Sequence, residues 1–505
     1  MISWARPKAH LDDADIDKGL RCLLYDSVFA QIMLVLTLGP FLVAFALHLG
    51  ASNKTIGVMA AIGPIAQIIQ IPAIFLVEWV RLRKALTVVA VFLSRLGLIG
   101  IGLTPWIIPS AYRIPAFLGF LSLFFAVGAV AGCAYNSWIR DLIPVDRMNA
   151  FFSRRLAVAT AVGAGISFLA GVGIDQYTER VGPPEQAYTI LFIVGAVFGL
   201  IAMFFLARTP EPVMPTEDSR SIVRMLLEPF RDVPFRNLLI FLGAWSFAVN
   251  FAAPFFAVYL ISYLGMNMTW VLTLSVFSQI VNVLFFGVWG RLADRFSNKS
   301  VLMLCVPVFF LTFLLWPFTT MPERYMLTIP ILAAIHVLAG ITTAGVALCA
   351  GNLALKTAPY GKGTAYLAVN ALISGIAATV SPLLAGLAAD WFEPYQVRMT
   401  LSSLLWESGD VLMELPTLDF RGLDFIFIIA FVLGIYSVHR LLAVREEGEV
   451  QNQVIRQAFL GEVQRMVRQV STIAGMRQII VFPFAYLPTL RRTQEPEVGS
   501  LDKMG

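Results

Sequence analysis

Twelve apolar runs separated by shorter polar segments dominate the pattern of hydrophobic and polar positions along this chain. Each run is close to the roughly 20 residues that a helix needs to cross the hydrocarbon core of a bilayer. Proline and glycine inside the runs are compatible with this, because neighbouring helices in a membrane bundle satisfy the backbone groups that they free. The pattern predicts an all-α membrane protein with twelve transmembrane helices, at residues 24–48, 55–78, 85–108, 115–138, 151–173, 187–206, 237–263, 269–289, 300–318, 325–350, 363–388 and 422–442.

Composition supports this prediction. The chain is 58% hydrophobic and 14% charged, with a mean hydropathy of +0.77, whereas a soluble domain has about 25% charged residues. The lipid bilayer is therefore the expected surroundings. The formal net charge of +5 does not indicate a nucleic-acid partner, because the basic residues lie between the apolar runs and do not form one patch.

The two halves of the chain repeat each other, with six predicted helices in each half. Equivalent residues lie about 215 positions apart, which is typical of transporters built from two parallel repeats. The matching pairs are Pro40 and Pro254, Asn136 and Asn352, Gly171 and Gly386, and Asp175 and Asp390. The repeat divides the chain into a cytoplasmic N-terminal tail (1–23), an N-terminal six-helix half (24–206), a cytoplasmic linker (207–236), a C-terminal six-helix half (237–444) and a cytoplasmic tail (445–505).

The distribution of basic residues predicts the orientation in the membrane. Cytoplasmic loops carry an excess of Lys and Arg. Here the loops after even-numbered helices are the basic ones, for example at Arg81, Arg83, Lys84, Arg154 and Arg155. We therefore expect both termini on the cytoplasmic side of a bacterial-type inner membrane.

One charged segment between two apolar runs is the most specific motif. It reads Gly290-Arg-Leu-Ala-Asp294-Arg295-Phe-Ser-Asn-Lys299, and so many charges predict a short aqueous turn. The pattern G-x-L-A-D-R-x-x-x-K resembles the loop signature of the major facilitator superfamily (MFS). At the equivalent place in the first half the aspartate is absent, and Glu78 and Trp79 occupy its neighbourhood.

The resemblance implies the MFS fold and transport by alternating access. It also implies that the loop aspartate and basic residues hold the cytoplasmic helix ends together in the outward-facing state. Asp294 would take this role, supported by Arg295 and Lys299, with partners expected near residues 150–155 and at Lys356. The alternative is that these charges only fix the topology.

Two charges end the fourth predicted helix. Arg140 and Asp141 form either an inter-helix lock in the first half or ordinary interfacial charges, and the sequence leaves both interpretations open.

Ionisable residues inside the predicted helices are the first candidates for a transport site, because charge is costly in a membrane. Arg95 lies near the middle of the third helix, where it would bind an anionic group or form a structural ion pair. Asp26 begins the first helix, as a carrier of a coupling proton or as a helix N-cap. His336 lies within the tenth helix and titrates near neutrality when unperturbed, although a hydrogen-bonded structural histidine is the commoner case.

Amide side chains recur at matching places and complete the candidate site: Asn136, Asn250, Gln279 and Asn352. Hydrogen bonds between helices would explain any one of them equally well. The resemblance implies that helices 1, 4, 7 and 10 line a central cavity, where Tyr135, Trp138, Trp245 and Tyr259 would supply aromatic walls.

The favoured function is a secondary transporter that moves a small solute through the inner membrane, coupled to an ion gradient with protons as one candidate. A receptor or assembly scaffold that no longer transports is the alternative. A membrane enzyme lacks supporting residues, since no nucleophile–base motif, metal cluster or nucleotide-binding loop is visible. We expect no cofactor, no metal and a monomer.

Two further segments stand out. The external segment 391–421 is long and acidic. In the tail, apolar residues at helical spacing over 450–470 predict an amphipathic helix. That helix would lie on the membrane surface, which is the favoured interpretation, pack under the bundle or bind a partner.

Overall fold

The computed structural model describes residues 7–8, 11–214, 228–320, 325–359, 363–404, 411–446 and 452–470. Parts of the predicted N-terminal tail, linker and C-terminal tail lie outside these residues. Within them, twelve helical segments are long and apolar enough to cross a membrane, one at each predicted position. The prediction of an all-α membrane protein with twelve such helices is therefore confirmed.

The N-terminal half contains spans 1 to 6. Span 1 consists of α1 (Asp13–Thr37) and α2 (Pro40–His48), and span 2 consists of α3 (Asn53–Ala66), a 3-10 turn (Gln67–Ile69) and α4 (Gln70–Val80). Span 3 is α5 (Arg83–Ile107), and span 4 consists of a 3-10 turn (Ser110–Tyr112) and α6 (Arg113–Leu142). Span 5 is α7 (Val145–Arg180), and span 6 is α8 (Pro184–Arg208).

The C-terminal half contains spans 7 to 12. Span 7 consists of α10 (Val233–Ala252), α11 (Phe255–Val258) and a π turn (Tyr259–Tyr263). Span 8 is α12 (Met268–Arg295), and span 9 consists of α13 (Asn298–Leu315) and a 3-10 turn (Trp316–Thr319). Span 10 is α14 (Thr328–Thr357), span 11 is α15 (Gly363–Phe392), and span 12 is α16 (Leu423–Leu442).

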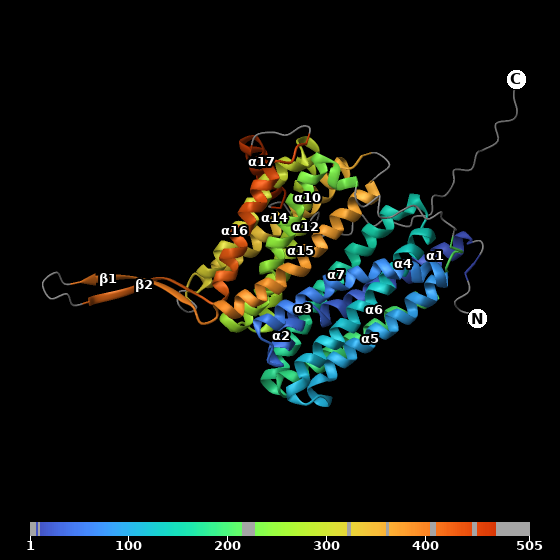
Figure 1. Ribbon diagram of the computed structural model, residues 1–505, viewed down its shortest axis with the longest axis horizontal. Coiled ribbons are helices and arrows are strands. Elements are labelled where there is room, and N and C mark those ends of the chain that lie inside the picture. The colour runs from blue at the N-terminus through green and yellow to red at the C-terminus, as the bar shows by residue number, and fades with distance from the viewer. Residues whose placement is uncertain are drawn as a thin grey trace, which may run out of the picture.

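The two ends of the bundle differ in character (Figure 1). One end carries the loops at 81–82, 143–144 and 296–297 and the helix α17 (Asn452–Val470), and we call it the basic end. The other end carries the antiparallel strands β1 (Gln396–Leu404) and β2 (Val411–Arg421), and we call it the hairpin end. The hairpin projects well beyond the helices (Figure 1).

Polar side chains set several helix starts. Asp12 accepts a hydrogen bond from the backbone N–H of Asp15 (2.7 Å), Asn267 from that of Trp270 (3.1 Å), and Ser297 from that of Ser300 (3.1 Å). Each acceptor satisfies a backbone N–H that the first helical turn leaves without a partner. Asn267 and Ser297 lie just before apolar runs, whereas Asp12 precedes a polar first part of α1 (Asp13 to Arg21) that comes before its apolar run.

The halves pack together mainly near the hairpin end. There α3 of span 2 lies along α15 of span 11, and α7 of span 5 lies along α12 of span 8. Small residues allow the close approach, since a Cβ on Gly386 would lie 2.9 Å from the carbonyl oxygen of Asn53. Toward the basic end, α4 packs on α5 and α6 of its own half, and the Trp79 side chain is 83% exposed. The bundle is thus closed at the hairpin end, and its halves diverge toward the basic end (Figure 1).

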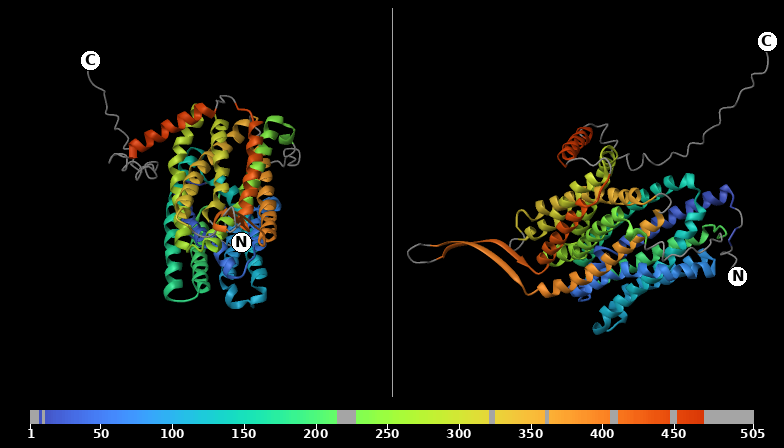
Figure 2. Two further views of the ribbon diagram at one scale, coloured as in Figure 1. Left: turned by 90° about the vertical axis from the view of Figure 1, so that its left-hand side faces the viewer. Right: turned by 45° about the horizontal axis from the view of Figure 1, so that its top comes forward.

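The tail helix α17 contacts the C-terminal half. Figure 2 shows it lying across the basic end of that half. The Phe459 ring stacks on Trp289 with centroids 4.7 Å apart, Ile455 is fully buried, and Glu462 forms a 3.2 Å ion pair with Arg291. Of the three alternatives for this predicted helix, packing on the bundle is therefore the one observed.

Candidate functional site

A cavity of about 610 Å³ lies between the two halves. Its walls come from spans 1, 2 and 4 of the first half and spans 7 to 10 of the second half. The lining residues lie within the part of each span nearer the hairpin end, directly inside the contacts that close this end. A mainly apolar space shared by two repeats is the place where transporters of this architecture hold a solute.

Two of the wall helices are broken at equivalent positions of the repeat. Span 1 is interrupted at Gly39, whose φ of +62° is a conformation that favours glycine. Span 7 is interrupted before Pro254, which cannot donate a backbone hydrogen bond. Both breaks line the cavity. Discontinuous helices expose backbone groups that can contact a solute.

The cavity wall carries little charge. Among its described lining residues none is Asp, Glu, Lys or Arg, and His336 is the one that can titrate near neutrality. The His336 Nδ1 lies 2.8 Å from the carbonyl oxygen of Leu332. Of the candidates chosen from the sequence, His336 is the one that the structure places in this wall.

The aromatic walls differ from those expected. Tyr135, Trp138, Trp245 and Tyr259 are not among the lining residues, and that expectation was wrong. Trp138, for example, is fully buried and donates its indole N–H to the carbonyl of Pro210 (2.9 Å). The observed walls use Phe256, Phe309, Phe313 and Trp316.

Asp26 and Arg95 lie inside the N-terminal half and not in the cavity wall. Asp26 is 7% exposed and interacts electrostatically with Arg155 and then with Arg95. The Arg95 guanidinium lies 5.8 Å from the Phe124 ring centroid, and its Nη1 donates to Ser94 Oγ (3.3 Å). Asp26 accepts no hydrogen bond from the residues that the structure describes. The cluster therefore holds a buried carboxylate whose oxygens are not engaged by described donors.

The four candidate amides do not converge on one site. Asn250 donates to the backbone carbonyl of Ser246 one turn earlier in the same helix (2.7 Å), and not to another helix as the alternative interpretation had it. Asn136 and Gln279 are exposed, and Asn352 is half-buried. None of the four is a described lining residue of the cavity.

The signature loop adopts an arrangement different from the one expected. Asp294 is exposed, and no hydrogen bond or ion pair joins it to the described residues near 150–155 or to Lys356. Lys356 instead contacts Glu446 (3.4 Å), and the Arg295 guanidinium lies over the Phe296 ring (5.1 Å). Residues 150–155 belong to the other half, which diverges from Asp294 at this end, whereas Lys356 belongs to the same half and pairs with Glu446.

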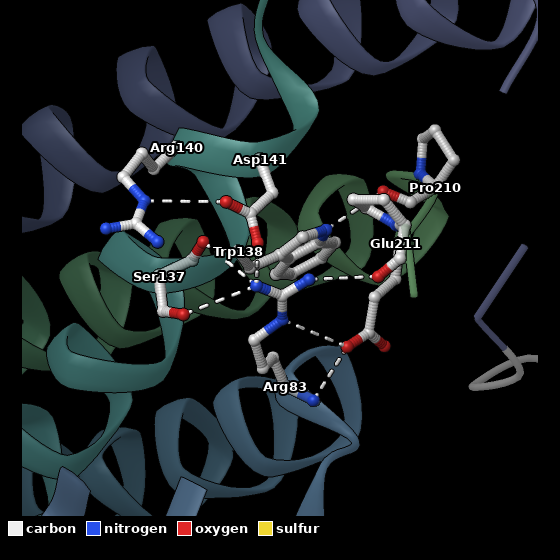
Figure 3. A network of polar contacts seen from close by, with 8 residues as sticks. Arg83, Ser137, Trp138, Arg140, Asp141, Pro210 and Glu211 are labelled. Carbon is white, nitrogen blue, oxygen red and sulfur yellow. Dashed lines mark hydrogen bonds and ion pairs between the residues drawn. The ribbon is translucent and has the colours of Figure 1, made fainter. Parts of the chain in front are cut away.

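A buried charge cluster ties the basic end of the N-terminal half together (Figure 3). Arg83, at the start of α5, is fully buried. Its Nη1 donates to Asp141 of α6 (2.5 Å) and to the Ser137 carbonyl (3.0 Å), and its Nη2 donates to the Pro212 carbonyl (2.9 Å). Arg140 lies 3.4 Å from the same Asp141. Asp141 therefore joins spans 3 and 4, whereas Arg140 is an exposed neighbour.

Glu211 completes this cluster from the segment after span 6. It is 2% exposed and accepts a hydrogen bond from the backbone N–H of Arg83 (2.7 Å), at the N-terminus of α5. Burial raises the pKa of the Glu211 carboxyl, and hydrogen bonds from the backbone N–H groups of Lys84 and Arg83 oppose that shift. Spans 3, 4 and 6 are thus held by one set of charges.

The C-terminal half repeats the plan with a different distribution of charge. Glu446, after span 12, accepts from the backbone N–H of Lys299 (2.7 Å) and from Asn298 Nδ2 (2.8 Å) at the N-terminus of α13. It also contacts Lys356 at the end of span 10. In both halves a glutamate after the last span caps the third span of the repeat. Glu446 itself contacts the fourth span, whereas in the first half Arg83 makes that connection.

At the hairpin end, two repeat-related aspartates cross from one half to the other. Asp175 of α7 accepts from the backbone N–H groups of Met268 (3.0 Å) and Thr269 (2.7 Å), at the start of α12. Asp390 of α15 accepts from the backbone N–H of Lys54 (3.1 Å), at the start of α3. Each carboxylate thus lies at the N-terminus of a helix in the opposite half, where the helix dipole favours negative charge.

Sequence reasoning found the Asp175–Asp390 repeat but assigned no role to it. Glu211 and Glu446 were missed because they lie beyond the apolar runs, where a single glutamate carries no motif. Arg83 was counted only as a basic loop residue. The matching spacing of Asp175 and Asp390 is the signal from which a paired role could have been predicted.

The comparisons with known proteins agree with this architecture. The family model described as Major Facilitator Superfamily matches residues 27–382, and the chain belongs to that superfamily. A curated relative, the uncharacterized MFS-type transporter YxiO of Bacillus subtilis (strain 168), is 23% identical over 209 residues. That match covers 37% of this chain and 47% of the relative, so it spans about half the relative's length.

Solved structures show the same fold. A mutant of the nucleoside transporter NupG superposes with a TM-score of 0.64 at 13% identity, covering 85% of this chain and all of that one. A D-xylose–proton symporter gives 0.60 at 13% identity, covering 88% and 99%. A bacterial homologue of the iron transporter ferroportin, in an inward-facing state, gives 0.59 at 11% identity, covering 86% and 100%. Family and fold together identify a multi-pass membrane transporter.

Proposed function

We propose that this protein moves a small solute across the cytoplasmic membrane by alternating access, coupled to an ion gradient. The observation that carries the proposal is the cavity formed by both halves directly inside a closed hairpin end. With the basic end facing the cytoplasm, as its Lys and Arg residues favour, this conformation opens inward. Rocking of the halves would open the hairpin end and close the basic end.

Asp294 is the proposed latch of the opposite state. It is exposed while the basic end is open, so its carboxylate is available to meet a helix terminus or a cation of the other half when this end closes. The Asp175 and Asp390 contacts would then have to break. Latches at the two ends would thus alternate.

Asp26 is the proposed proton-carrying group. A buried carboxylate in a membrane bundle is a candidate for proton exchange. Asp424, the other buried carboxylate in a described span, accepts hydrogen bonds from Tyr259 Oη (3.0 Å) and from the Arg421 backbone N–H (2.9 Å), so both of its oxygens already have a donor. The Asp26 oxygens accept no hydrogen bond from a described donor. The positive charges of Arg155 and Arg95 attract them electrostatically.

A solute screen followed by flux measurement tests the proposed function. A solute at 100 times its dissociation constant should stabilise purified protein by about 2.7 kcal/mol. Solutes that stabilise it are then loaded into proteoliposomes, and exchange is measured with and without a pH gradient. Exchange that follows the pH gradient supports proton coupling. Binding without any exchange would contradict transport and favour the receptor or scaffold alternative.

Asp294→Asn is expected to impair conformational cycling without lowering stability in the inward-open state, because the charge acts only when the basic end closes. The measurement is the population of the closed basic end, from the distance between spin labels at Leu156→Cys on α7 and Phe286→Cys on α12. Asp17→Asn is the matched control, since Asp17 pairs with Arg147 within one half at the same end (3.0 Å). An unchanged closed population in Asp294→Asn, with normal exchange, would refute the latch.

A further inference from the structure

We propose that the cavity selects an uncharged solute with an aromatic body and at least one O–H or N–H group, which donates a hydrogen bond to Nε2 of His336. This inference rests on the proposed function and adds the chemical class of the solute. It is carried by the shape and chemistry of the cavity wall.

The wall on the side of the C-terminal half is aromatic. The Phe256 ring stacks against Trp316 with centroids 4.9 Å apart and meets Phe313 edge-on at 5.5 Å. All three residues line the cavity. Such a surface favours planar apolar groups, because aromatic pairs gain from stacked and edge-on contacts beyond the area that they bury.

The wall also selects against net charge. Its described lining residues include no carboxylate that could pair with a cation and no Lys or Arg that could pair with an anion. The charged groups Asp26, Arg95 and Arg155 belong to the cluster inside the N-terminal half. A charged solute against this wall would therefore lose part of its hydration without gaining a charged partner.

The geometry of His336 fixes its hydrogen-bonding role. Nδ1 lies 2.8 Å from the Leu332 carbonyl oxygen, which can only accept, so Nδ1 carries the hydrogen. With no carboxylate on the wall to stabilise an imidazolium, the ring is neutral and Nε2 is an acceptor. Since the Nδ1 edge faces its own helix, the opposite edge with Nε2 is the part available to the cavity.

Two wall hydroxyls add acceptors. Thr312 donates to the Phe309 carbonyl (2.6 Å) and Ser275 donates to the Val271 carbonyl (2.9 Å), so each has used its hydrogen within its own helix. Among the described lining residues, the Ser278 hydroxyl and the Trp316 indole N–H are the side-chain donors that have no acceptor among described groups. His336, Thr312 and Ser275 thus offer acceptors for the hydrogen-bond donor of the solute.

Four probes with one ring system test this class on the full-length protein in detergent by equilibrium dialysis. They are 2-naphthol, 2-methoxynaphthalene, naphthalene-2-sulfonate and (2-naphthyl)trimethylammonium. We expect 2-naphthol to bind about threefold to tenfold more tightly than its methyl ether, as one net hydrogen bond allows. We expect the two charged probes to bind at least about tenfold more weakly than 2-naphthol.

Variants separate the wall from general effects on the protein. His336→Phe should abolish the preference for 2-naphthol over the ether, and His336→Gln, which keeps an acceptor, should retain most of it. His48→Phe is the matched control, because His48 lies beside Tyr188 (5.3 Å) and does not line the cavity. The preference should survive there.

Three results would overturn the inference: equal binding of 2-naphthol and its ether, tighter binding of a charged probe, or a preference that persists in His336→Phe. Failure of all four probes to bind would also overturn it. None of these results removes the proposed transport function, because proteoliposome exchange and the movement of the two bundle ends are measured independently of these probes.

Discussion

Replacement of Arg83 by alanine is expected to lower the free energy of unfolding by about 3–5 kcal/mol, because it removes a buried cation from the buried Glu211 and the partly buried Asp141. Arg83 is fully buried, and its guanidinium joins Asp141, Ser137 and Pro212. Glu211, also buried, would keep its backbone hydrogen bond but lose the nearby positive charge. Thermal unfolding of purified protein measures the effect.

Two further variants make this test specific. Arg140→Ala removes a contact to the same Asp141 but from a side chain that is 64% exposed, so we expect a change within about 0.5 kcal/mol. Arg83→Lys keeps the charge but lacks the planar fork that reaches several acceptors, and it should fall between the two. Equal stability of Arg83→Ala and Arg140→Ala would contradict the proposed importance of the cluster.

Substitution of Asp175 and Asp390 by alanine is expected to shift the protein away from the conformation closed at the hairpin end. Each carboxylate caps a helix of the opposite half, and loss of a cap costs about 0.5–2 kcal/mol. Because the two sites are well separated, the effects should add in the double variant. A change of about 1.4 kcal/mol corresponds to tenfold in the conformational equilibrium.

Spin labels at Glu179→Cys on α7 and Trp270→Cys on α12 report this shift across the hairpin end. The matched control is Asp232→Ala, which removes a cap on α10 and a 3.2 Å hydrogen bond from Tyr366, all within the C-terminal half. It should lower stability and leave the label distance unchanged. If the double variant and the control give the same distance distribution as the unmodified protein, the aspartates are not the latch.

The helices and their pairing into two halves were predictable because both depend on local or repeated sequence features. A run of apolar residues specifies a span by itself, and residues such as Pro40 and Pro254 mark the repeat without any knowledge of packing. The breaks at Gly39 and before Pro254 fall within two of the predicted helices, at positions that the proline repeat had already marked.

The site was less predictable because it depends on which side of each helix faces the cavity. Arg95 was chosen for its depth in the membrane, but depth does not reveal direction, and its side chain points into the N-terminal half. The aromatic wall was assigned to the wrong residues for the same reason. Under the proposed mechanism the contacts of Asp294 would depend on the conformation, since residues 150–155 would approach it only when the basic end closes.

The central claim is that the two bundle ends open in alternation. The most direct test measures two distances between α7 and α12, with labels at Glu179→Cys and Trp270→Cys near the hairpin end and at Leu156→Cys and Phe286→Cys near the basic end. The four native cysteines are replaced first. The account predicts that the Asp175→Ala, Asp390→Ala double variant lengthens the first distance and shortens the second. Distances that stay fixed, or that lengthen together at both ends, would contradict alternating access.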